Sequence, residues 1–416
     1  MLRIMGHALL WGSLLLGELL PFAQAEVPVK PKVRAITAFV RIGRADYLSR
    51  IDEALVVLRA ARGEFERQGY QVETLRVVTQ PLGELVQGQS DDEALAFLNE
   101  LDALAAKEQF SANVGPAMLS DSDDPRGMRL LARALVSLNN ISASAIIAAA
   151  DGIHWRVVRE SAVLVRQLSV GSQHSQATFR FAASALLGPY GPFFPGAYHT
   201  GAGGQFSVGF EGAGVVQEVF ARTHGDFNSS VTELTRQLTL HAGKAQQIGE
   251  AIAVSHGWTF AGVDPTPAPM GDLSIGAAME AYSGARFGSS GTMTAALAIT
   301  TAVKAVPVRQ VGYAGLMVPV MEDKLLAQRW AEGTFDVDAL LAYSAVCGTG
   351  LDTVPLPGDV TVDQLTRMLG DVASLAWKWH KPLSARLQPV QGKRAGDRTD
   401  FADPRLFDTT LHTLRQ

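Results

Sequence analysis

The chain has 416 residues, of which 47% are hydrophobic and 19% are charged, and its formal net charge is −5. This composition is typical of a globular protein with one large or two medium domains. No basic block stands out along the chain, so composition argues against a nucleic-acid partner.

The first 25 residues differ from the rest. Arg3 supplies a small positive start, residues 8–20 are nearly all apolar or small, and A-Q-A at 23–25 matches a small-x-small cleavage site. The apolar run is too short to span a bilayer comfortably. We therefore predict a signal peptide over 1–25, a linker over 26–32, a periplasmic or secreted protein, and no stable membrane anchor after cleavage.

Cys347 is the only cysteine. An intramolecular disulfide is therefore excluded. A free thiol in an oxidising compartment favours either a buried or a functional position for this residue.

The first half of the chain alternates between strand and helix patterns. Strands are expected at 33–42, 70–78, 110–114, 142–150 and 177–183, and helices at 47–68, 91–108, 126–139 and 153–168. Such alternation implies parallel strands joined by right-handed crossovers, in an open sheet or a barrel. Residues 186–214, rich in glycine, proline and aromatic residues, are expected to form a loop.

The alternation then resumes. Helices are expected at 215–223, 229–255, 273–284, 292–304, 324–332, 336–345 and 362–379, and strands at 258–264, 312–318 and 383–390. No polar linker separates two halves, and no internal repeat is visible. We predict one large α/β domain over 33–400 and a peripheral C-terminal tail over 401–416.

Several loops after predicted strands carry carboxylates, and ligands of α/β proteins bind at the carboxyl ends of strands. Asp264 begins D-P-T-P-A-P, and Glu322 and Asp323 follow the strand expected at 312–318. With Asp359, these residues are the predicted ligands of a divalent cation, Ca²⁺ or Mg²⁺. The alternative is that they cap turns and helices.

A second candidate is R-F-G-S-S-G-T at 286–292, which opens a predicted helix. Backbone N–H groups, two hydroxyls and the helix dipole suit an anion. The predicted substrate-binding residues are Arg286, Gly288, Ser289, Ser290, Gly291 and Thr292. The alternative is a glycine turn with a hydroxyl cap.

A third candidate is S-A-V-C-G-T-G-L-D-T-V-P-L-P-G-D at 344–359, expected to be a rigid shaped loop. Cys347 and Asp352 are predicted to be catalytic, and Gly348, Thr349 and Gly350 to contact substrate. The alternative is that the cysteine is a small core residue.

The segment P-F-F-P-G-A-Y-H at 192–199 suits a small-molecule pocket, with His199 as a third catalytic candidate. The alternative is that its rings fill the core. No H-E-x-x-H, C-x-x-C, EF-hand or G-x-S-x-G motif occurs, and no G-x-G-x-x-G follows the first strand.

Together with F-R-F-A-A, G-L-M-V-P-V-M-E-D and G-K-R-A-G-D, these segments resemble the bacterial and archaeal family catalogued as domain of unknown function 711, also called uncharacterised protein family 0210. The resemblance runs from about residue 33 to about residue 401. The family is similar in fold to pyruvate formate-lyase and the anaerobic ribonucleotide reductases. The resemblance therefore implies a ten-stranded α/β barrel made of two parallel five-stranded halves.

In those enzymes a cysteine on a central loop meets a glycyl radical near the C-terminus. The resemblance places Cys347 and residues 392–397 in the corresponding segments. The radical enzymes have R-V-[ST]-G-Y around that glycine, whereas this chain has K-R-A-G-D. We therefore expect no radical chemistry. Typical family members look cytosolic, so the predicted signal peptide is a departure from them.

The sequence predicts a non-radical lyase, hydrolase or isomerase that acts on a small anionic metabolite at an acidic site. The alternatives are a periplasmic binding protein without catalysis, or a structural protein whose loops only pack. A homodimer is expected from the general frequency of two-fold assemblies.

Overall fold

The structure is a computed structural model, and it describes residues 29–346 and 349–414. The predicted signal peptide lies outside the described residues, as do Cys347 and Gly348. Within the described part, no helix combines the length and the apolar character that a membrane crossing requires.

Ten strands form one sheet. They are β1 (Lys32–Val40), β2 (Val72–Val78), β3 (Ser111–Pro116), β4 (Ile141–Ala149), β5 (Gly152–Ile153), β6 (Phe181–Ala185), β7 (Gly203–Glu211), β8 (Thr259–Ala268), β9 (Gly350–Pro357) and β10 (Leu383–Val390). Nine of them follow the order β8-β7-β1-β2-β3-β4-β6-β10-β9, and the short β5 pairs with β4.

The strand directions divide the sheet into two groups. β1, β2, β3, β4 and β6 are parallel to their neighbours in the group. β7 with β8, and β9 with β10, are parallel pairs, and they join the first group through the antiparallel contacts β1/β7 and β6/β10. The predicted α/β architecture is confirmed. The first group has the five parallel strands predicted for each half, and the second has four, β7 to β10.

The sheet is not closed, because β8 and β9 are not hydrogen-bonded to each other. The segment 309–323 fills the position between them with isolated bridges, Val263 to Gln310 and Pro319 to Asp352. The prediction of a strand at 312–318 is wrong. Part of this segment is turned away from strand geometry, and Ala314 has a φ of +43°.

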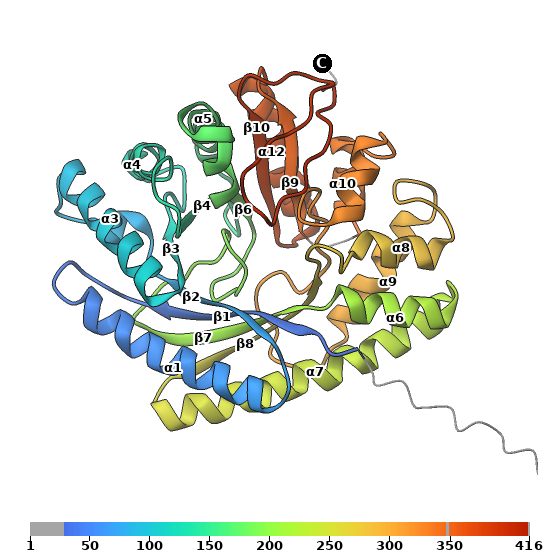
Figure 1. The fold of residues 1–416 in the computed structure, drawn as a ribbon. Helices are drawn as coiled ribbons and strands as arrows, with labels where there is room; N and C mark the ends of the chain where they lie inside the picture. The colour runs from blue at the N-terminus through green and yellow to red at the C-terminus, as the bar shows by residue number, and fades with distance from the viewer. Residues whose placement is uncertain (1–28, 347–348, 415–416) are drawn as a thin grey trace, which may run out of the picture.

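Helices surround the strands on the outside (Figure 1). They are α1 (Tyr47–Arg67), α2 (Leu82–Leu85), α3 (Asp91–Glu108), α4 (Arg126–Ala134), α5 (Trp155–Gly171), the 3-10 helix η1 (Gln173–Arg180), α6 (Ala213–Thr223), α7 (Phe227–His256), α8 (Ile275–Ser283), α9 (Thr292–Lys304), α10 (Lys324–Ala331), α11 (Val337–Ser344) and α12 (Val362–Trp379). Capping boxes start α3 at Ser90 and α12 at Thr361.

Two strands lie where loops were expected. β7 falls within the loop predicted at 186–214, although Phe206, Val208 and Phe210 alternate and are buried. β9 carries Pro355 and Pro357. It ends the hydrogen-bonded strand order, where proline is tolerated because only one side needs ladder partners. A strand expected at 177–183 begins only at Phe181, after η1.

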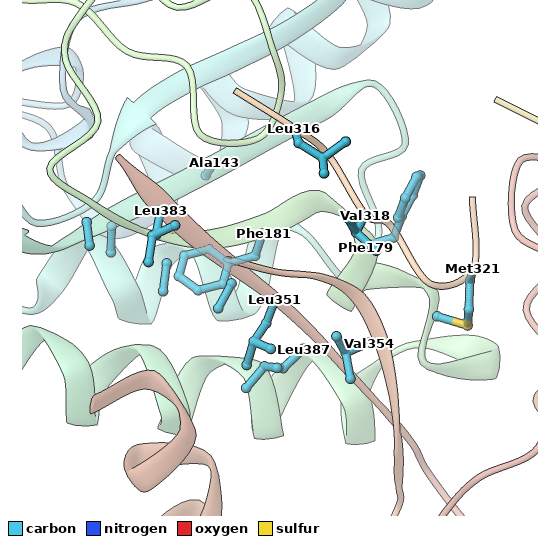
Figure 2. Packing of buried hydrophobic residues seen from close by; sticks show 14 of the residues in the cluster. Ala143, Phe179, Phe181, Leu316, Val318, Met321, Leu351, Val354, Leu383 and Leu387 are labelled. Atoms are coloured by element: carbon cyan, nitrogen blue, oxygen red, sulfur yellow. The ribbon is translucent and has the colours of Figure 1, made fainter. Parts of the chain in front are cut away.

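The main hydrophobic core runs through the described chain from Val33 to Leu411, and two small clusters lie beside it around Phe193 and Phe39. Figure 2 shows the part in which Leu316, Val318 and Met321 of the bridging segment share a cluster with Leu351 and Val354 of β9. The packing of these apolar side chains holds the bridging segment in place without a regular strand ladder.

The C-terminal segment differs from the expectation of a peripheral tail. Leu406 and Leu411 are buried. Trp330 Nε1 donates to the Thr410 carbonyl at 3.0 Å, and Thr409 Oγ1 donates to the Ala327 carbonyl at 2.6 Å. The segment therefore belongs to the packed body, against α10.

Candidate functional site

The loop between β6 and β7 enters the middle of the barrel (Figure 1). The Pro192 carbonyl accepts from Thr37 Oγ1 at 2.9 Å, and the Pro195 carbonyl accepts from Asn113 Nδ2 at 2.6 Å. His199 Nε2 lies 3.0 Å from the Val40 carbonyl. These contacts reach the later residues of β1 and β3, so the loop fills the interior toward the carboxyl ends of those strands.

A cavity of about 130 Å³ remains toward the opposite end. Arg34, Ser111 and Ser142 line it, and each lies near the start of its strand. The cavity therefore lies at the amino ends of the strands in the first parallel group, whereas the sequence predicted a site at their carboxyl ends. The loop between β6 and β7 fills the space at the carboxyl ends.

Arginine dominates the charge of this cavity, which we call the arginine cavity. Its lining includes Arg34 of β1, Arg76 of β2, Arg180 at the end of η1, Arg386 of β10 and Arg405 of the C-terminal segment. Three carboxylates also line it, Glu322, Asp352 and Asp403. Cationic side chains therefore outnumber anionic ones on the wall.

Three of these arginines are paired with carboxylates. Arg386 Nε lies 2.5 Å from Asp352 Oδ1, and its Nη2 forms a salt bridge with Glu322 Oε2. Burial lowers the pKa of Arg386, but the two carboxylates outweigh burial and raise it above its ordinary value. Arg405 lies 2.6 Å from Asp403.

Arg34 belongs to a second charged cluster at the edge of the cavity. Its Nη1 lies 2.9 Å from Glu73 and 3.4 Å from Glu211, and its Nη2 lies 3.6 Å from Glu322. Lys32 contacts both Glu73 and Glu211, at 3.0 and 3.3 Å. Burial and the neighbouring carboxylate of Glu73 raise the pKa of Glu211 to about 7.

Arg76 has no carboxylate within 4.0 Å among the described residues. Its Nε donates to Thr74 Oγ1 at 3.0 Å, its Nη1 donates to the Pro192 carbonyl at 3.3 Å, and its guanidinium lies 4.9 Å from the Phe194 ring centre. Burial, with repulsion from Arg34 and other arginines, lowers the pKa of Arg76 to about 9. This positive charge therefore has no ion-pair partner in the described chain, and Glu322 acts on it only at longer range.

Arg180 is similar. Its Nη2 donates to the Leu135 carbonyl at 2.6 Å, while its Nε is buried and has no hydrogen-bond partner in the described chain. Burial lowers its pKa. Within residues 29–346 and 349–414, no salt bridge involves this arginine.

A bulge in β9 directs Asp352 toward Arg386. In the pairing of β9 with β10, Leu351 is opposite Ala385 and Val354 is opposite Leu387. Asp352 and Thr353 therefore both lie opposite Arg386, which is a β-bulge, and Thr353 has a φ of +45°. This local strain brings the carboxylate, predicted to be catalytic, into the cavity.

Asp352 is buried, and burial raises its pKa although Arg386 acts in the opposite direction. Tyr313 also lines the cavity, and its hydroxyl donates to Ser384 Oγ at 2.9 Å. Burial raises the pKa of this phenol as well. The predicted contact residue Thr349 lies on the same wall.

The carboxylate of Asp264, a predicted metal ligand, accepts hydrogen bonds from backbone N–H groups. Asp264 accepts from the N–H groups of Thr266, Tyr313 and Ala314 at 3.0, 2.8 and 3.1 Å, and also from the Thr266 hydroxyl. Its carboxylate thus holds the turn that presents Tyr313. This is the cap-like role that was the alternative to metal binding.

Asp323 caps two helices. It accepts from Leu325 and Leu326 of α10, from Ile275 and Gly276 of α8, and from the Ser274 hydroxyl. With these bonds made, its oxygens have little capacity left for a cation.

The four predicted metal ligands are not brought together as one site. Glu322 lies in the cavity, Asp264 and Asp323 bind backbone groups, and Asp359 is exposed in the turn after β9. No group of three or more His, Cys, Asp or Glu side chains in the described part of the chain is arranged to hold a metal. The divalent cation stays a prediction.

The predicted anion turn at 286–292 lies away from the cavity. Arg286 is 66% exposed and lies 3.6 Å from Glu332. The Gly288 N–H donates to Thr292 Oγ1 at 3.1 Å, as in the hydroxyl-capped turn that was the alternative. Neither these residues nor Ser289, Ser290 and Gly291 line the arginine cavity.

Two further candidates have packing roles. His199 is fully buried beside Tyr190, outside the cavity lining, and burial lowers its pKa. Gly350 has a φ of +88° and lies against the Ser384 carbonyl, where a side chain would collide. The predicted roles of Cys347 and Gly348 are on residues that the structure does not describe.

Sequence reasoning did not identify the five arginines. A signal was present: V-R-A-I, L-R-V-V and S-A-R-L place single arginines inside otherwise apolar strands. Burying an isolated charge on a strand costs folding free energy unless the charge has a partner or a ligand. No local pattern, however, indicates that β1, β2 and β10, which carry these arginines, share one interior.

The chain matches the family model described as "Uncharacterised ACR (DUF711)" over residues 29–403. A "UPF0210 protein" of Pyrobaculum aerophilum is 32% identical over 92% of this chain and 89% of that protein. A "UPF0210 protein" of Desulforudis audaxviator is 29% identical over 81% of this chain and 78% of that protein.

Among solved structures, the chain is similar to an "Anaerobic ribonucleotide reductase" at 7% identity and a TM-score of 0.39, covering 85% of this chain and 70% of that one. A ribonucleotide reductase from Thermotoga maritima with citrate in the active site gives 8% identity and a TM-score of 0.35, covering 85% and 80%. Nothing about the chemistry of this chain follows from similarity at that level.

Proposed function

We propose, from the premise that this chain belongs to the DUF711 family, that it binds a small anionic metabolite in the arginine cavity and acts on it without radical chemistry. The observation that carries the proposal is that, among the described residues, the buried guanidinium of Arg76 contacts only neutral acceptors and forms no ion pair. A buried charge without a counter-charge is costly, and an anion in the cavity would remove that cost.

The class of reaction that we propose is a lyase, hydrolase or isomerase reaction based on proton transfer. Asp352 and Tyr313 line the same cavity as Arg76. General acid–base catalysis needs a titratable group within hydrogen-bond reach of a substrate that is held in place. The raised pKa of Asp352 supports a role as proton donor or acceptor.

The alternative is a binding protein without catalysis. It is favoured by one observation: Glu322 and Asp352, the carboxylates beside Arg386, are already paired with that arginine. A carboxylate held by a guanidinium is a weaker base than a free one.

Isotope exchange distinguishes the two. The purified protein is incubated with a mixture of small organic anions in D₂O and, separately, in H₂¹⁸O, and the anions are analysed by mass spectrometry. Deuterium in one compound would indicate a lyase or isomerase, and ¹⁸O a hydrolase. We expect Asp352→Asn to abolish the label. Anion-dependent stabilisation without any label would support the binding protein. The absence of both label and stabilisation would overturn the proposal.

Binding itself is tested by thermal unfolding with the same anions. Arg76→Met is expected to lose the stabilisation that a bound anion provides. Arg286→Met is the matched control, since this exposed arginine was predicted from sequence but does not line the cavity. Equal stabilisation of both variants would contradict the assignment of the site.

Export, a divalent cation and a homodimer are proposed on the sequence predictions alone. N-terminal sequencing of the protein from fractionated cells tests cleavage near residue 25. Elemental analysis of protein purified without chelator tests the cation, and native mass spectrometry tests the dimer.

A further inference from the structure

Arg76 and Arg180, the two unpaired arginines of the cavity, come from different parts of its wall. Arg76 lies in β2, and Arg180 immediately precedes β6. The order β2-β3-β4-β6 separates these strands by three neighbour spacings, or about 14 Å along the sheet. The two guanidinium groups therefore reach the same cavity from different strands of the sheet.

Each guanidinium is partly held by the protein and partly unsatisfied. Arg76 uses Nε and Nη1 on Thr74 and Pro192, and no described residue accepts from its Nη2. Arg180 uses Nη2 on Leu135, and its Nε has no partner in the described chain. These hydrogen bonds fix the orientation of both guanidinium groups, so that each can bind an anionic oxygen without reorganising.

Five arginines and three carboxylates line the cavity, which leaves an excess of two positive charges on its wall. Burial is the main reason why the pKa of each of the two arginines, Arg76 and Arg180, is lowered, and repulsion from Arg405 acts in the same direction. Glu322 opposes this shift at Arg76, and Asp102 and Asp403 oppose it at Arg180, although none of these carboxylates forms an ion pair with them in the described chain. Arg405 itself is paired with Asp403. A monoanion could pair with one of the two arginines and would leave the other buried without an ion-pair partner.

The wall between the two arginines is lined with neutral polar groups. Ser111 begins β3 and Ser142 lies at the start of β4, the two strands between β2 and β6. Neither hydroxyl has a hydrogen-bond partner among the described residues. They are suited to bond an oxygen substituent of a ligand that spans the two arginines.

We infer that the ligand is a small hydroxylated or keto dicarboxylate whose two carboxylates lie at Arg76 and at Arg180. This inference rests on the proposed function, because it specifies the anion that the arginine cavity binds. The cavity of about 130 Å³ limits the ligand to a short chain.

The test is isothermal titration calorimetry of the full-length mature protein with matched probes at one ionic strength. Malate and succinate carry two carboxylates with and without a hydroxyl, lactate carries one carboxylate and a hydroxyl, and inorganic phosphate is a compact dianion. We expect malate to bind at least tenfold more tightly than lactate, with succinate between them.

The variants locate the two carboxylates. Arg76→Met and Arg180→Met should each weaken malate binding at least tenfold and bring its Kd close to that of lactate. Arg286→Met should leave every Kd unchanged. If a methionine variant does not fold, the lysine variant is used, because it keeps the charge but loses the planar fork.

The outcomes separate the two levels of the proposal. Equal affinity for malate and lactate, with both lost in Arg76→Met, would overturn the dicarboxylate inference and leave the anion site standing. Tightest binding of phosphate that depends on Arg76 but not on Arg180 would also overturn it. If no probe binds at millimolar concentration and no other small organic anion stabilises the wild type, both proposals fail.

Discussion

Glu322 and Asp323 are neighbours in the chain, yet their carboxylates serve different parts of the molecule. Glu322 contacts Arg386 and Arg34 in the arginine cavity. Asp323 binds backbone N–H groups at the starts of α8 and α10. Both residues are buried. The residue type alone does not determine the role of a buried carboxylate; its partners do.

The same division holds for Asp352 and Asp264. Asp352 faces a guanidinium, and Asp264 faces the backbone of residues 313 and 314. A carboxylate saturated by backbone N–H groups stabilises the fold, whereas one paired with an arginine beside a cavity can respond to a ligand. The following experiments test this division, from the largest expected effect to the smallest.

Arg386→Met should give the largest loss of stability. It leaves Asp352 and Glu322 buried without their counter-charge, which costs about 3–5 kcal/mol. Urea unfolding of ligand-free protein measures the loss. Arg386→Lys should cost less, because the charge is kept. A loss below about 1 kcal/mol for the methionine variant would show that the two carboxylates are protonated or solvated instead.

Asp323→Ala should lower the free energy of unfolding by about 3 kcal/mol, because two helix starts lose their side-chain cap. The matched control is Asp272→Ala. Asp272 is 86% exposed, and among the described residues it pairs only with Lys324, so its loss should cost at most about 0.5 kcal/mol. Equal effects in the two variants would contradict the structural role of Asp323.

Glu211 should make stability depend on pH. Its pKa of about 7 lies above the value of about 4.3 for an unfolded chain, so the folded protein holds this proton more tightly. The associated stability is complete below pH 4 and is lost as the pH rises to 7, by about 3 kcal/mol.

His241, whose pKa burial lowers to about 4, acts in the opposite direction over part of that range. The informative measurement is therefore the difference between wild type and Glu211→Gln, from urea unfolding at several pH values between 4 and 8. A constant difference across this range would show that Glu211 titrates normally.

Arg76→Met should have the smallest effect on stability, and of opposite sign. Removing a buried and unpaired charge should raise the stability of ligand-free protein by about 1 kcal/mol. The same variant should lose its response to anions. Thermal unfolding with and without succinate measures both effects. A destabilised Arg76→Met protein that still responds to succinate would assign Arg76 to packing alone.

Much of the fold could be predicted from the sequence. The bounds of α3, α9 and α12 agree with the prediction, because each of these helices has its own apolar periodicity and two of them have capping boxes. β7 and β9 were missed because their glycines and prolines are typical of loops. Both lie in the second strand group, where the sheet is least regular.

The candidate site was predicted only in part. Asp352, Thr349 and Glu322 are on the cavity wall as expected, whereas Arg286 and His199 are not. The predicted residues were selected because they lie in loops after strands. Most of the arginines of the cavity lie inside strands or just before one, where a pattern search gives them no special weight.

By itself, the sequence determined the family, the mixed α/β class and the positions of most helices, because periodicity and capping act between residues close in the chain. Only the tertiary structure decided the cavity. Its charged residues extend from Arg34 to Arg405, and they meet because the strand order brings β1, β2, β6 and β10 around one interior. The charge of each residue is encoded locally, but whether it is paired depends on contacts between segments that are distant in the chain.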